Sequence, residues 1–200
     1  PDLPLWPGDK AIEIQTNHSL EDGDVATDSS ILMNLHNGTH IDAPSHFIQS
    51  GKTIDKVSIE ALIGPVVVFR IEDSIEVISE EVLVGLDIPS KTTRILFRTA
   101  NSRLWKTQEN VFYEKFTALS SDGAEWLVKH GIKLVGIDYL SIQRYFDGPE
   151  VHQILLNAEV IVIEGLNLSG VDSGQYQLYC LPINLKGLEA APARVVLGPL

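Results

Sequence analysis

Residues 36–46 read HNGTHIDAPSH, and this stretch decides how the rest of the chain is interpreted. It contains His36, His40 and His46, three of the six histidines of the chain, together with Asp42. Imidazole and carboxylate groups gathered in one place are the ligands that first-row metals, and Zn²⁺ in particular, take in proteins. The stretch therefore predicts a metal or catalytic site.

We interpret residues 31–42 as a strand that carries this site. Alternate side chains of a strand share one face, so His36, His40 and Asp42 would point the same way. Pro44 would end the strand pairing. A histidine just past that proline would lie close to the cluster but remain free for another role.

Two other arrangements of these histidines fit the sequence less well. Two histidines four residues apart could lie on one helix face, as in the His-Glu-x-x-His pattern of metalloproteases. Asn37 occupies the position of that glutamate, and Gly38 and Pro44 disfavour a helix. The histidines could also be exposed loop residues without a ligand, but a cluster of this density favours a metal or catalytic site.

The composition is that of an ordinary globular protein. A chain of 200 residues suits a single domain over residues 1–200, and no apolar run approaches the ~20 residues of a membrane span. The net charge of −12 disfavours nucleic acid and anionic membranes as partners. The only cysteine, Cys180, is expected to be a buried thiol in a reducing, cytoplasmic compartment. Because the chain begins at Pro1 without methionine, we expect a short N-terminal piece to be missing.

Short strands alternate with short helices along most of the chain, which predicts an α/β fold. We expect the helices at residues 58–63, 80–86, 121–131 and 149–157. Besides residues 31–42, we expect strands at residues 10–15, 65–71, 94–98, 132–138, 159–164 and 193–197.

Two later residues are candidates for the second half of a metal site. His152 lies in the helix expected at residues 149–157, and Glu164 lies at the end of an apolar strand. A carboxylate at a strand end is where α/β sheets tend to build their sites. Spacing alone leaves each residue equally open to a structural role, as a half-buried helix residue or a solvated strand end.

The histidine motif resembles the signature of the metal-dependent cyclase family, which includes bacterial kynurenine formamidases and the related isatin hydrolases. The matching motif is His36-x-Gly38-Thr39-His40-x-Asp42-Ala43-Pro44-x-His46-Phe47. Further segments that resemble the family are Trp6-Pro7-Gly8-Asp9, Asn101-Ser102-x-Leu104-Trp105, Gly136-Ile137-Asp138 and residues 152–164. The resemblance covers nearly the whole chain.

This resemblance implies a swivelling β/β/α fold, usually in a homodimer or a higher homo-oligomer. The ligands that it implies for one metal are His36, His40 and Asp42. Asp42 would bridge to a second metal, completed by His152 and Glu164. Zinc, with two ions per subunit, is the metal expected for formamidases, and manganese is expected for the isatin branch.

The same resemblance implies that His46 transfers a proton and that Trp6 contacts the substrate. For the implied oligomer, Trp105 and residues 111–113 could supply an apolar contact surface, or they could belong to the core.

One departure from the family pattern concerns the choice of substrate. Formamidases of the family carry Thr-Pro-Ser after the Gly-x-Asp strand end, whereas Tyr139-Leu140-Ser141 follows Asp138 here. The difference lies near the expected pocket, so it bears on N-formylkynurenine as the substrate rather than on hydrolysis itself.

The expected activity is metal-assisted hydrolysis of a C–N amide bond in a small molecule, as in an arylformamidase of tryptophan catabolism that converts N-formylkynurenine to kynurenine and formate. A metal makes water acidic enough to attack at neutral pH and polarises the carbonyl group. The first alternative is a hydrolase of cyclic amides, imides or lactones of the isatin hydrolase type. The second is a noncatalytic metal-binding protein.

Overall fold

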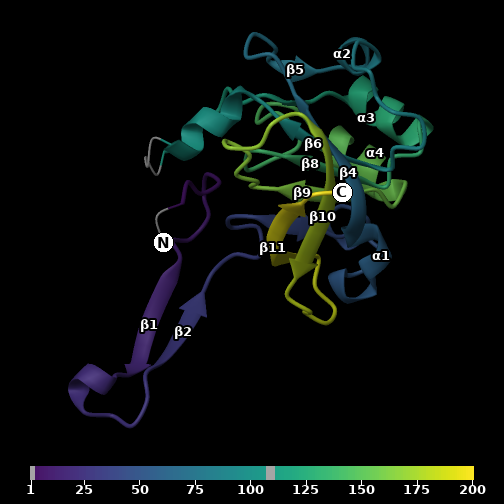
Figure 1. Ribbon diagram of the computed structural model, residues 1–200. Coiled ribbons are helices and arrows are strands. Elements are labelled where there is room, and N and C mark those ends of the chain that lie inside the picture. Colours follow the sequence, from purple (N-terminus) through teal and green to yellow (C-terminus); the bar gives the residue numbers. More distant parts are fainter. Residues whose placement is uncertain (1–2, 107–110) are drawn as a thin grey trace.

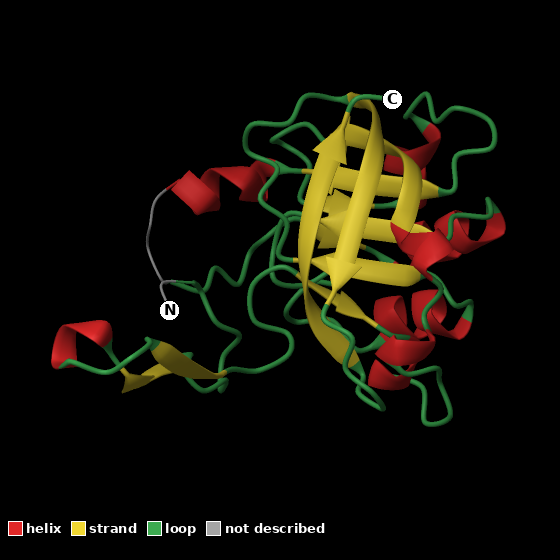
Figure 2. Ribbon diagram, turned by 60° about the horizontal axis from the view of Figure 1, so that its bottom comes forward, coloured by secondary structure: helices red, strands yellow, loops and turns green. Residues whose placement is uncertain are grey.

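The computed structural model describes residues 3–106 and 111–200, and its body is a closed barrel of seven strands (Figures 1 and 2). Around the barrel the strands follow the order β10-β11-β3-β9-β8-β6-β4. Their bounds are β3 His40–Asp42, β4 Ile63–Arg70, β6 Arg94–Arg98, β8 Leu134–Ile137, β9 Ile161–Glu164, β10 Gly174–Pro182 and β11 Ala190–Gly198.

The barrel joins a parallel half to an antiparallel half. Strands β4, β6, β8 and β9 pair in parallel, whereas β3 runs antiparallel to both of its neighbours, β9 and β11. In this register His40 lies opposite Glu164, and Asp42 lies opposite Ala190 of β11. The short strand β3 therefore brings two of the predicted ligands beside a third.

Helices cover the outer face of the parallel half (Figure 2). They are α2 (Glu80–Val84), α3 (Ser121–Lys129) and α4 (Glu150–Asn157), and a shorter helix, α1 (Ile59–Leu62), leads into β4. Ile95 and Phe97 of β6 pack toward the helices, whereas Leu96 between them packs inside the barrel. Burial on both faces explains why these parallel strands are nearly all apolar.

Short elements complete the body. Strands β5 (Val77–Ile78) and β7 (Ala118–Leu119) form a small parallel pair. The 3-10 turns of the body are η2 (Pro44–His46), η3 (Ile54–Lys56) and η4 (Ala100–Lys106), whereas η1 (Leu20–Asp22) lies outside it.

One element stands away from the body. Strands β1 (Glu13–His18) and β2 (Asp28–Leu32) form a two-stranded antiparallel ribbon that extends from it (Figure 1). We call residues 11–32 the arm. Every residue of both strands is exposed.

The predicted α/β class is confirmed, as are the strand at residues 94–98 and helices close to the predicted bounds. The predicted strand over residues 31–42 is wrong for most of its length, because β2 ends at Leu32 and only residues 40–42 pair as β3. A tight turn interrupts it, in which Asn37 N donates to Asn34 O at 3.1 Å and Asn34 N donates to Asn37 Oδ1 at 2.9 Å. Gly38 follows with φ of 71°, a left-handed conformation that no strand contains.

Strand β10 was not predicted, because both of its faces carry apolar residues. Leu178 and Cys180 point into the barrel and are fully buried, whereas Tyr179 and Leu181, which alternate with them, are exposed. Such a strand lacks the alternation of polar and apolar residues that marks a half-buried strand. The strand predicted at residues 65–71 does alternate in burial, since Val66 and Val68 face the barrel interior.

The aromatic residues considered for an oligomer contact are partly used within the chain. Trp105 Nε1 donates to the carbonyl oxygen of Asp138 at 2.9 Å, and Phe112 packs against Trp6 with ring centroids 5.1 Å apart. They thus help to position the segment that follows β6.

Gly165 follows β9 and packs against the backbone of Gly38, and we expect its replacement by alanine to destabilise the protein. Gly165 has φ of 67°, and an added Cβ would overlap the backbone carbonyl of Gly38. Strain and overpacking together should lower the free energy of unfolding by about 2 to 4 kcal/mol. Urea denaturation measures this change. Gly170→Ala, where a Cβ meets nothing within 4 Å, is the control and should stay within about 0.5 kcal/mol of the parent.

Cys180 should be inert while the protein is folded. Its side chain is buried in the barrel, as predicted, and burial raises the pKa of the thiol to about 12. We expect no reaction with a thiol-specific chromogenic disulfide at pH 8 in buffer, and one equivalent in denaturant. A Ser90→Cys variant, altered at an exposed position, should gain one rapidly reacting thiol. Rapid native labelling of the unaltered protein would contradict the packing of β10.

Candidate metal centre

The predicted ligands meet where β3 passes between β9 and β11. His40 Nε2 lies 3.4 Å from Asp42 Oδ1 and 3.4 Å from Glu164 Oε2, and all three side chains are buried. One ligand atom from each of the three residues lies within 4.8 Å of the others, a spacing that could hold a metal ion. The antiparallel register of β3 against β9 produces this group directly.

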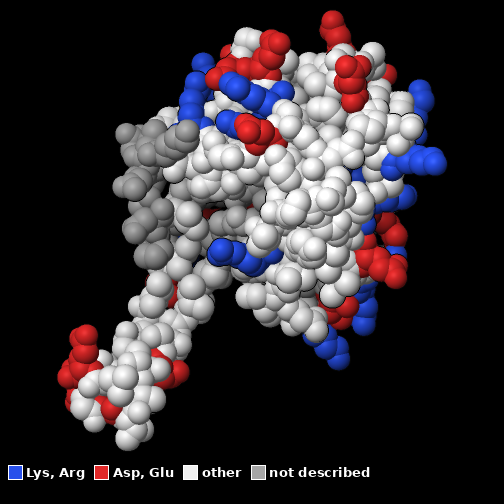
Figure 3. All heavy atoms as spheres, viewed as in Figure 1, with Lys and Arg blue, Asp and Glu red and all other residues white. Residues whose placement is uncertain are grey.

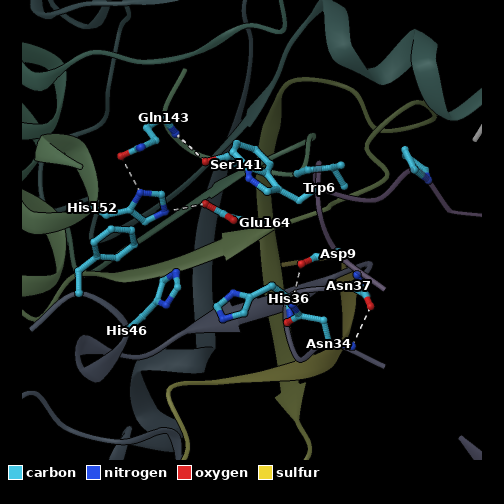
Figure 4. A pocket seen from close by; sticks show the side chains of 13 residues that line it. Trp6, Asp9, Asn34, His36, Asn37, His46, Ser141, Gln143, His152 and Glu164 are labelled. Atoms are coloured by element: carbon cyan, nitrogen blue, oxygen red, sulfur yellow. Dashed lines mark hydrogen bonds and ion pairs between the residues drawn. The ribbon is translucent and has the colours of Figure 1, made fainter. Parts of the chain in front are cut away.

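A second group shares Asp42. His36 Nδ1 lies 3.0 Å from Asp42 Oδ1, and ligand atoms of His36, Asp42 and His46 also lie within 4.8 Å of one another. The rings of His36 and His46 are 4.2 Å apart between centroids. His36 reaches the group from the turn before β3, and His46 reaches it from η2, which begins at Pro44. Figure 4 shows both rings at the cavity.

His152 of α4 completes the cluster from the helix side. Its Nε2 lies 3.0 Å from Glu164 Oε1 (Figure 4) and 3.5 Å from Asp42 Oδ2. Phe47 stacks on its ring with centroids 4.6 Å apart. Glu164 Oε1 also accepts a hydrogen bond of 2.7 Å from Ile142 N. One oxygen of Asp42, Oδ2, thus faces His152, whereas the other, Oδ1, faces His36 and His40.

Two of the histidine rings are oriented by hydrogen bonds at the nitrogen that faces away from the carboxylates. His40 Nδ1 donates to Gly38 O at 3.0 Å, and His152 Nδ1 donates to Gln143 Oε1 at 2.8 Å. In a neutral ring this places the proton on Nδ1 and the lone pair on Nε2, toward the carboxylates. Such second hydrogen bonds are typical of metal-bound histidines.

The polar atoms at the centre fit a metal ion. Among the described residues, His40 Nε2 and both carboxylate oxygens of Asp42 are buried without a hydrogen-bond partner. Buried polar atoms are rarely left unpaired unless another group completes them. Imidazole nitrogens and carboxylate oxygens form the ligand set that zinc and related divalent ions accept. The residues present therefore fit the group that the sequence predicted.

Without an ion, protons on the histidines neutralise the buried carboxylates. Burial alone would lower the pKa of His40, but the adjacent carboxylates of Asp42 and Glu164 outweigh it and raise the pKa to about 10. Burial also opposes the charge of His152, whose pKa the same two carboxylates raise to about 9. In turn the histidines hold the pKa of Asp42 well below its usual range, against the effect of burial. Positive charge, from protons on His40 and His152 or from a bound metal ion, can therefore neutralise the buried carboxylates.

His46 differs from its neighbours. Burial lowers the pKa of His46, and only part of that effect is offset by the charge of Asp42. The neutral imidazole, which can accept a proton, is therefore its favoured form near neutral pH.

The cluster lies at the bottom of a cavity of about 300 Å³. Four residues of the cluster border it: His36, His46, His152 and Glu164 (Figure 4). The rest of its wall is apolar or carries amide, hydroxyl or carboxylate groups, and consists of Pro4, Trp6, Asp9, Asn34, Asn37, Phe47, Leu140, Ser141 and Gln143. None of the described residues that line it is lysine or arginine. Leu140, which stands where formamidases carry proline, borders the cavity, as does Ser141, which matches the formamidase pattern.

The structure thus brings together all seven residues singled out from the sequence. These are His36, His40, Asp42, His46, His152, Glu164 and Trp6. Two residues at the site were not foreseen. Gln143 touches His152, and Glu189 Oε1 lies 3.7 Å from His36 Nε2. Neither belongs to a motif: Gln143 lies in a connecting segment nine residues before His152, and Glu189 lies far along the chain from His36.

Comparison with known proteins agrees with this geometry. The Cyclase family model matches residues 1–144. Cyclase-like protein 1 of Arabidopsis thaliana is 34% identical over 98% of this chain and 80% of its own length. Kynurenine formamidase of Bacillus cereus (strain ATCC 10987 / NRS 248) is 30% identical over all of this chain and 93% of its own length. The chain therefore belongs to the Cyclase family.

Solved structures give the same result. A predicted metal-dependent hydrolase from Bacillus stearothermophilus is 35% identical, with a TM-score of 0.82 over 98% of this chain and 91% of that one. An isatin hydrolase bound to the product analogue thioisatinate is 19% identical, with a TM-score of 0.85 over all of this chain and 89% of that one, and supports the fold alone. The expected cyclase-like fold is confirmed. Relatives and geometry together support a metal-dependent hydrolase.

In the part of the chain that the structure describes, no helix combines the length and apolar character needed to cross a membrane.

Gln143 should strengthen metal binding by fixing the ring of His152. Gln143→Leu removes the acceptor for Nδ1, and loss of such a hydrogen bond weakens metal binding about 10- to 100-fold. Gln143→Glu, which keeps an acceptor, should retain tight binding. Competition with a chromogenic chelator measures the zinc dissociation constant. Gln153→Leu, the same change at an exposed position of α4, is the control. Equal zinc affinities in all variants would show that Gln143 does not strengthen metal binding.

Proposed function

We propose that this protein is a metal-dependent hydrolase of C–N amide bonds, acting as an arylformamidase on a small aromatic formamide such as N-formylkynurenine. The observation that supports this most is the buried histidine and carboxylate cluster at the bottom of a cavity with an aromatic wall. The kynurenine formamidase relative supports the same reaction. The enzyme would act in the cytoplasm on a small-molecule substrate.

In this proposal the cluster holds two zinc ions per subunit, or manganese as the alternative. His36, His40 and Asp42 would bind one ion. Asp42, His152 and Glu164 would hold the second ion, so Asp42 would serve both; a carboxylate has two oxygen atoms for this, whereas a neutral imidazole has one lone pair to offer. Such ions supply a Lewis acid for the carbonyl oxygen and make water more acidic.

His46 moves the proton in this mechanism. Its ring lies beside His36 and opens onto the cavity, so it can reach both an attacking water and the leaving nitrogen. Its favoured neutral form accepts the proton from water at a ring nitrogen. The imidazolium then returns that proton to the amine as the C–N bond breaks.

Trp6 orients the aromatic part of the substrate. Phe112 and Tyr145 contact its ring edge-to-face at 5.1 and 5.3 Å, which fixes the plane of the indole at the cavity. A flat apolar wall opposite the histidines favours an aromatic amide over an aliphatic one.

One observation favours a second candidate, the hydrolysis of a neutral cyclic amide or lactone. N-formylkynurenine carries a carboxylate, but the described residues that line the cavity include no lysine or arginine to pair with it. At the same wall, Leu140 replaces the proline of the formamidase pattern. A neutral bicyclic substrate such as isatin needs no such cation.

Removing His46 separates a proton-transfer role from a ligand role. For His46→Ala we expect unchanged zinc content and a loss of turnover of about 10²- to 10⁴-fold, because a positioned acid–base group contributes that much. Metal analysis and initial rates measure both. His130→Ala, on the stacked and exposed His130–Trp126 pair, should change neither. A loss of bound zinc would instead make His46 a ligand, as its distance from Asp42 also permits.

The substrate is tested with metal-stripped protein reloaded with Zn²⁺ or Mn²⁺. N-formylkynurenine, isatin and simple cyclic amides or lactones are offered side by side. Turnover of N-formylkynurenine with zinc supports the formamidase, and turnover of only a cyclic substrate supports the second candidate. Tight metal binding with no turnover of any compound would contradict both and leave a noncatalytic metal-binding protein.

A further inference from the structure

Asn37 holds its side-chain amide at the cavity wall with one hydrogen-bonding group unused. The residue is only 4% exposed, and it borders the cavity of about 300 Å³. Its Oδ1 accepts a hydrogen bond of 2.9 Å from Asn34 N. Among the residues that the structure describes, no group accepts a hydrogen bond from its Nδ2. A buried amide with an unused donor is available to a molecule bound in the cavity.

The orientation of this amide is fixed by its neighbour. Asn34 N is a donor, so the Asn37 atom that faces it must be the oxygen, and the nitrogen must lie on the other side. Asn37 N also donates to Asn34 O at 3.1 Å, and His36 N donates to Asn34 Oδ1 at 3.0 Å. Figure 4 shows the amide nitrogen of Asn37 turned away from Asn34. The turn therefore presents a donor in a defined direction, with little side-chain entropy left to lose on binding.

This donor lies close to the place where a substrate would be cleaved. Asn37 directly follows His36, whose Nδ1 lies 3.0 Å from Asp42 Oδ1 in the cluster. A substrate with its amide carbonyl at the cluster would place the adjoining atoms near Asn37, while its ring lies against Trp6 on the same cavity. Nδ2 would thus meet a group next to the C–N bond and not one at the far end of the molecule.

The charge of the cavity favours an uncharged acceptor for this donor. Outside the cluster, Asp9 is the charged residue among the described wall residues, and Asn34 Nδ2 joins it to this side at 3.0 Å. A substrate carboxylate at Asn37 would find no lysine or arginine and would be repelled by Asp9. A ketone or amide oxygen accepts from the neutral amide without that penalty. Asn37 therefore suits a neutral carbonyl oxygen.

We propose that Asn37 determines specificity by donating from Nδ2 to a second, neutral carbonyl oxygen of the substrate, next to the amide bond that is cleaved. The substrate class is then aromatic amides with a neighbouring carbonyl, either an ortho-acyl anilide or a cyclic amide with an adjacent ketone. A compound without this oxygen leaves the buried donor unpaired and is selected against. The inference rests on the proposed function, because it names the substrates of the same site.

The contact is tested by removing each of its two partners in turn. Ortho-acetylformanilide carries the second carbonyl, and ortho-ethylformanilide has a similar shape without that oxygen. Asn37→Asp keeps the acceptor for Asn34 N but removes the donor, and Asn37→Ala removes both. In zinc-loaded protein each variant should lower kcat/KM for the acetyl compound by about 10- to 100-fold more than for the ethyl compound. Comparing the ratio between variants cancels the different intrinsic reactivity of the two compounds.

Asn167→Asp is the matched control. Asn167 is exposed and outside the cavity wall, and its Oδ1 likewise accepts a backbone hydrogen bond, from Ser169 N at 3.2 Å. This variant should leave both rates unchanged. Zinc content and melting temperature show whether the cluster and the turn of each Asn37 variant remain intact. An equal fall in rate for the two compounds, or no fall for either, would overturn the proposal.

Binding separates this inference from the proposed reaction. If no formamide or cyclic amide is hydrolysed, the proposed function fails, and the contact is then measured by calorimetry. Isatin has the second carbonyl, whereas oxindole lacks it. The unaltered zinc-loaded protein should bind isatin about 10- to 100-fold more tightly than oxindole, and Asn37→Asp should abolish the difference. Equal affinities in the unaltered protein, or no binding of either compound, would overturn the inference.

Discussion

Asp42 and Glu164 place two carboxylates side by side in the interior, and the rest of the site follows from the need to neutralise them. A buried carboxylate is stable only when opposite charge or hydrogen-bond donors surround it. Three histidines and one backbone N–H supply part of this, yet both oxygens of Asp42 remain without a hydrogen bond. Either protons on the imidazoles or divalent ions must complete the arrangement, and divalent ions bring the charge without demanding protonated ligands.

The barrel achieves this arrangement with one very short strand. β3 has three residues, and its pairing with β9 on one side and β11 on the other fixes where His40 and Asp42 point. Thr39 Oγ1 donates to Gly165 O at 2.7 Å, which fastens the strand entrance to the end of β9. Close approach of Gly38 and Gly165 allows the turn before β3 to bring His36 back over the same carboxylate.

Much of the site could be predicted from the sequence because its chemistry is concentrated in eleven residues. The way in which His36 reaches Asp42 could not be predicted, because a turn at Asn34–Asn37 replaces the strand that the alternation of histidines predicted. Gln143 and Glu189 could not be predicted because both lie in connecting segments outside any motif, and Glu189 is also far along the chain from His36. Strand β10 could not be predicted for a different reason: exposed Tyr179 and Leu181 make its outer face apolar, so its polar and apolar residues do not alternate.

Two segments of the cavity wall lie on either side of the arm in the sequence. Wall segments at residues 4–9 and 34–37 have few strand hydrogen bonds of their own, and the chain between them leaves the body entirely as the arm. Segments with little regular pairing open most easily. The hydrogen bond from Asn34 Nδ2 to Asp9 Oδ1, at 3.0 Å, joins the two segments at the base of the arm. Because Trp6 lies in one segment and His36 in the other, this contact helps to keep the aromatic side and the histidine side of the cavity at a constant separation.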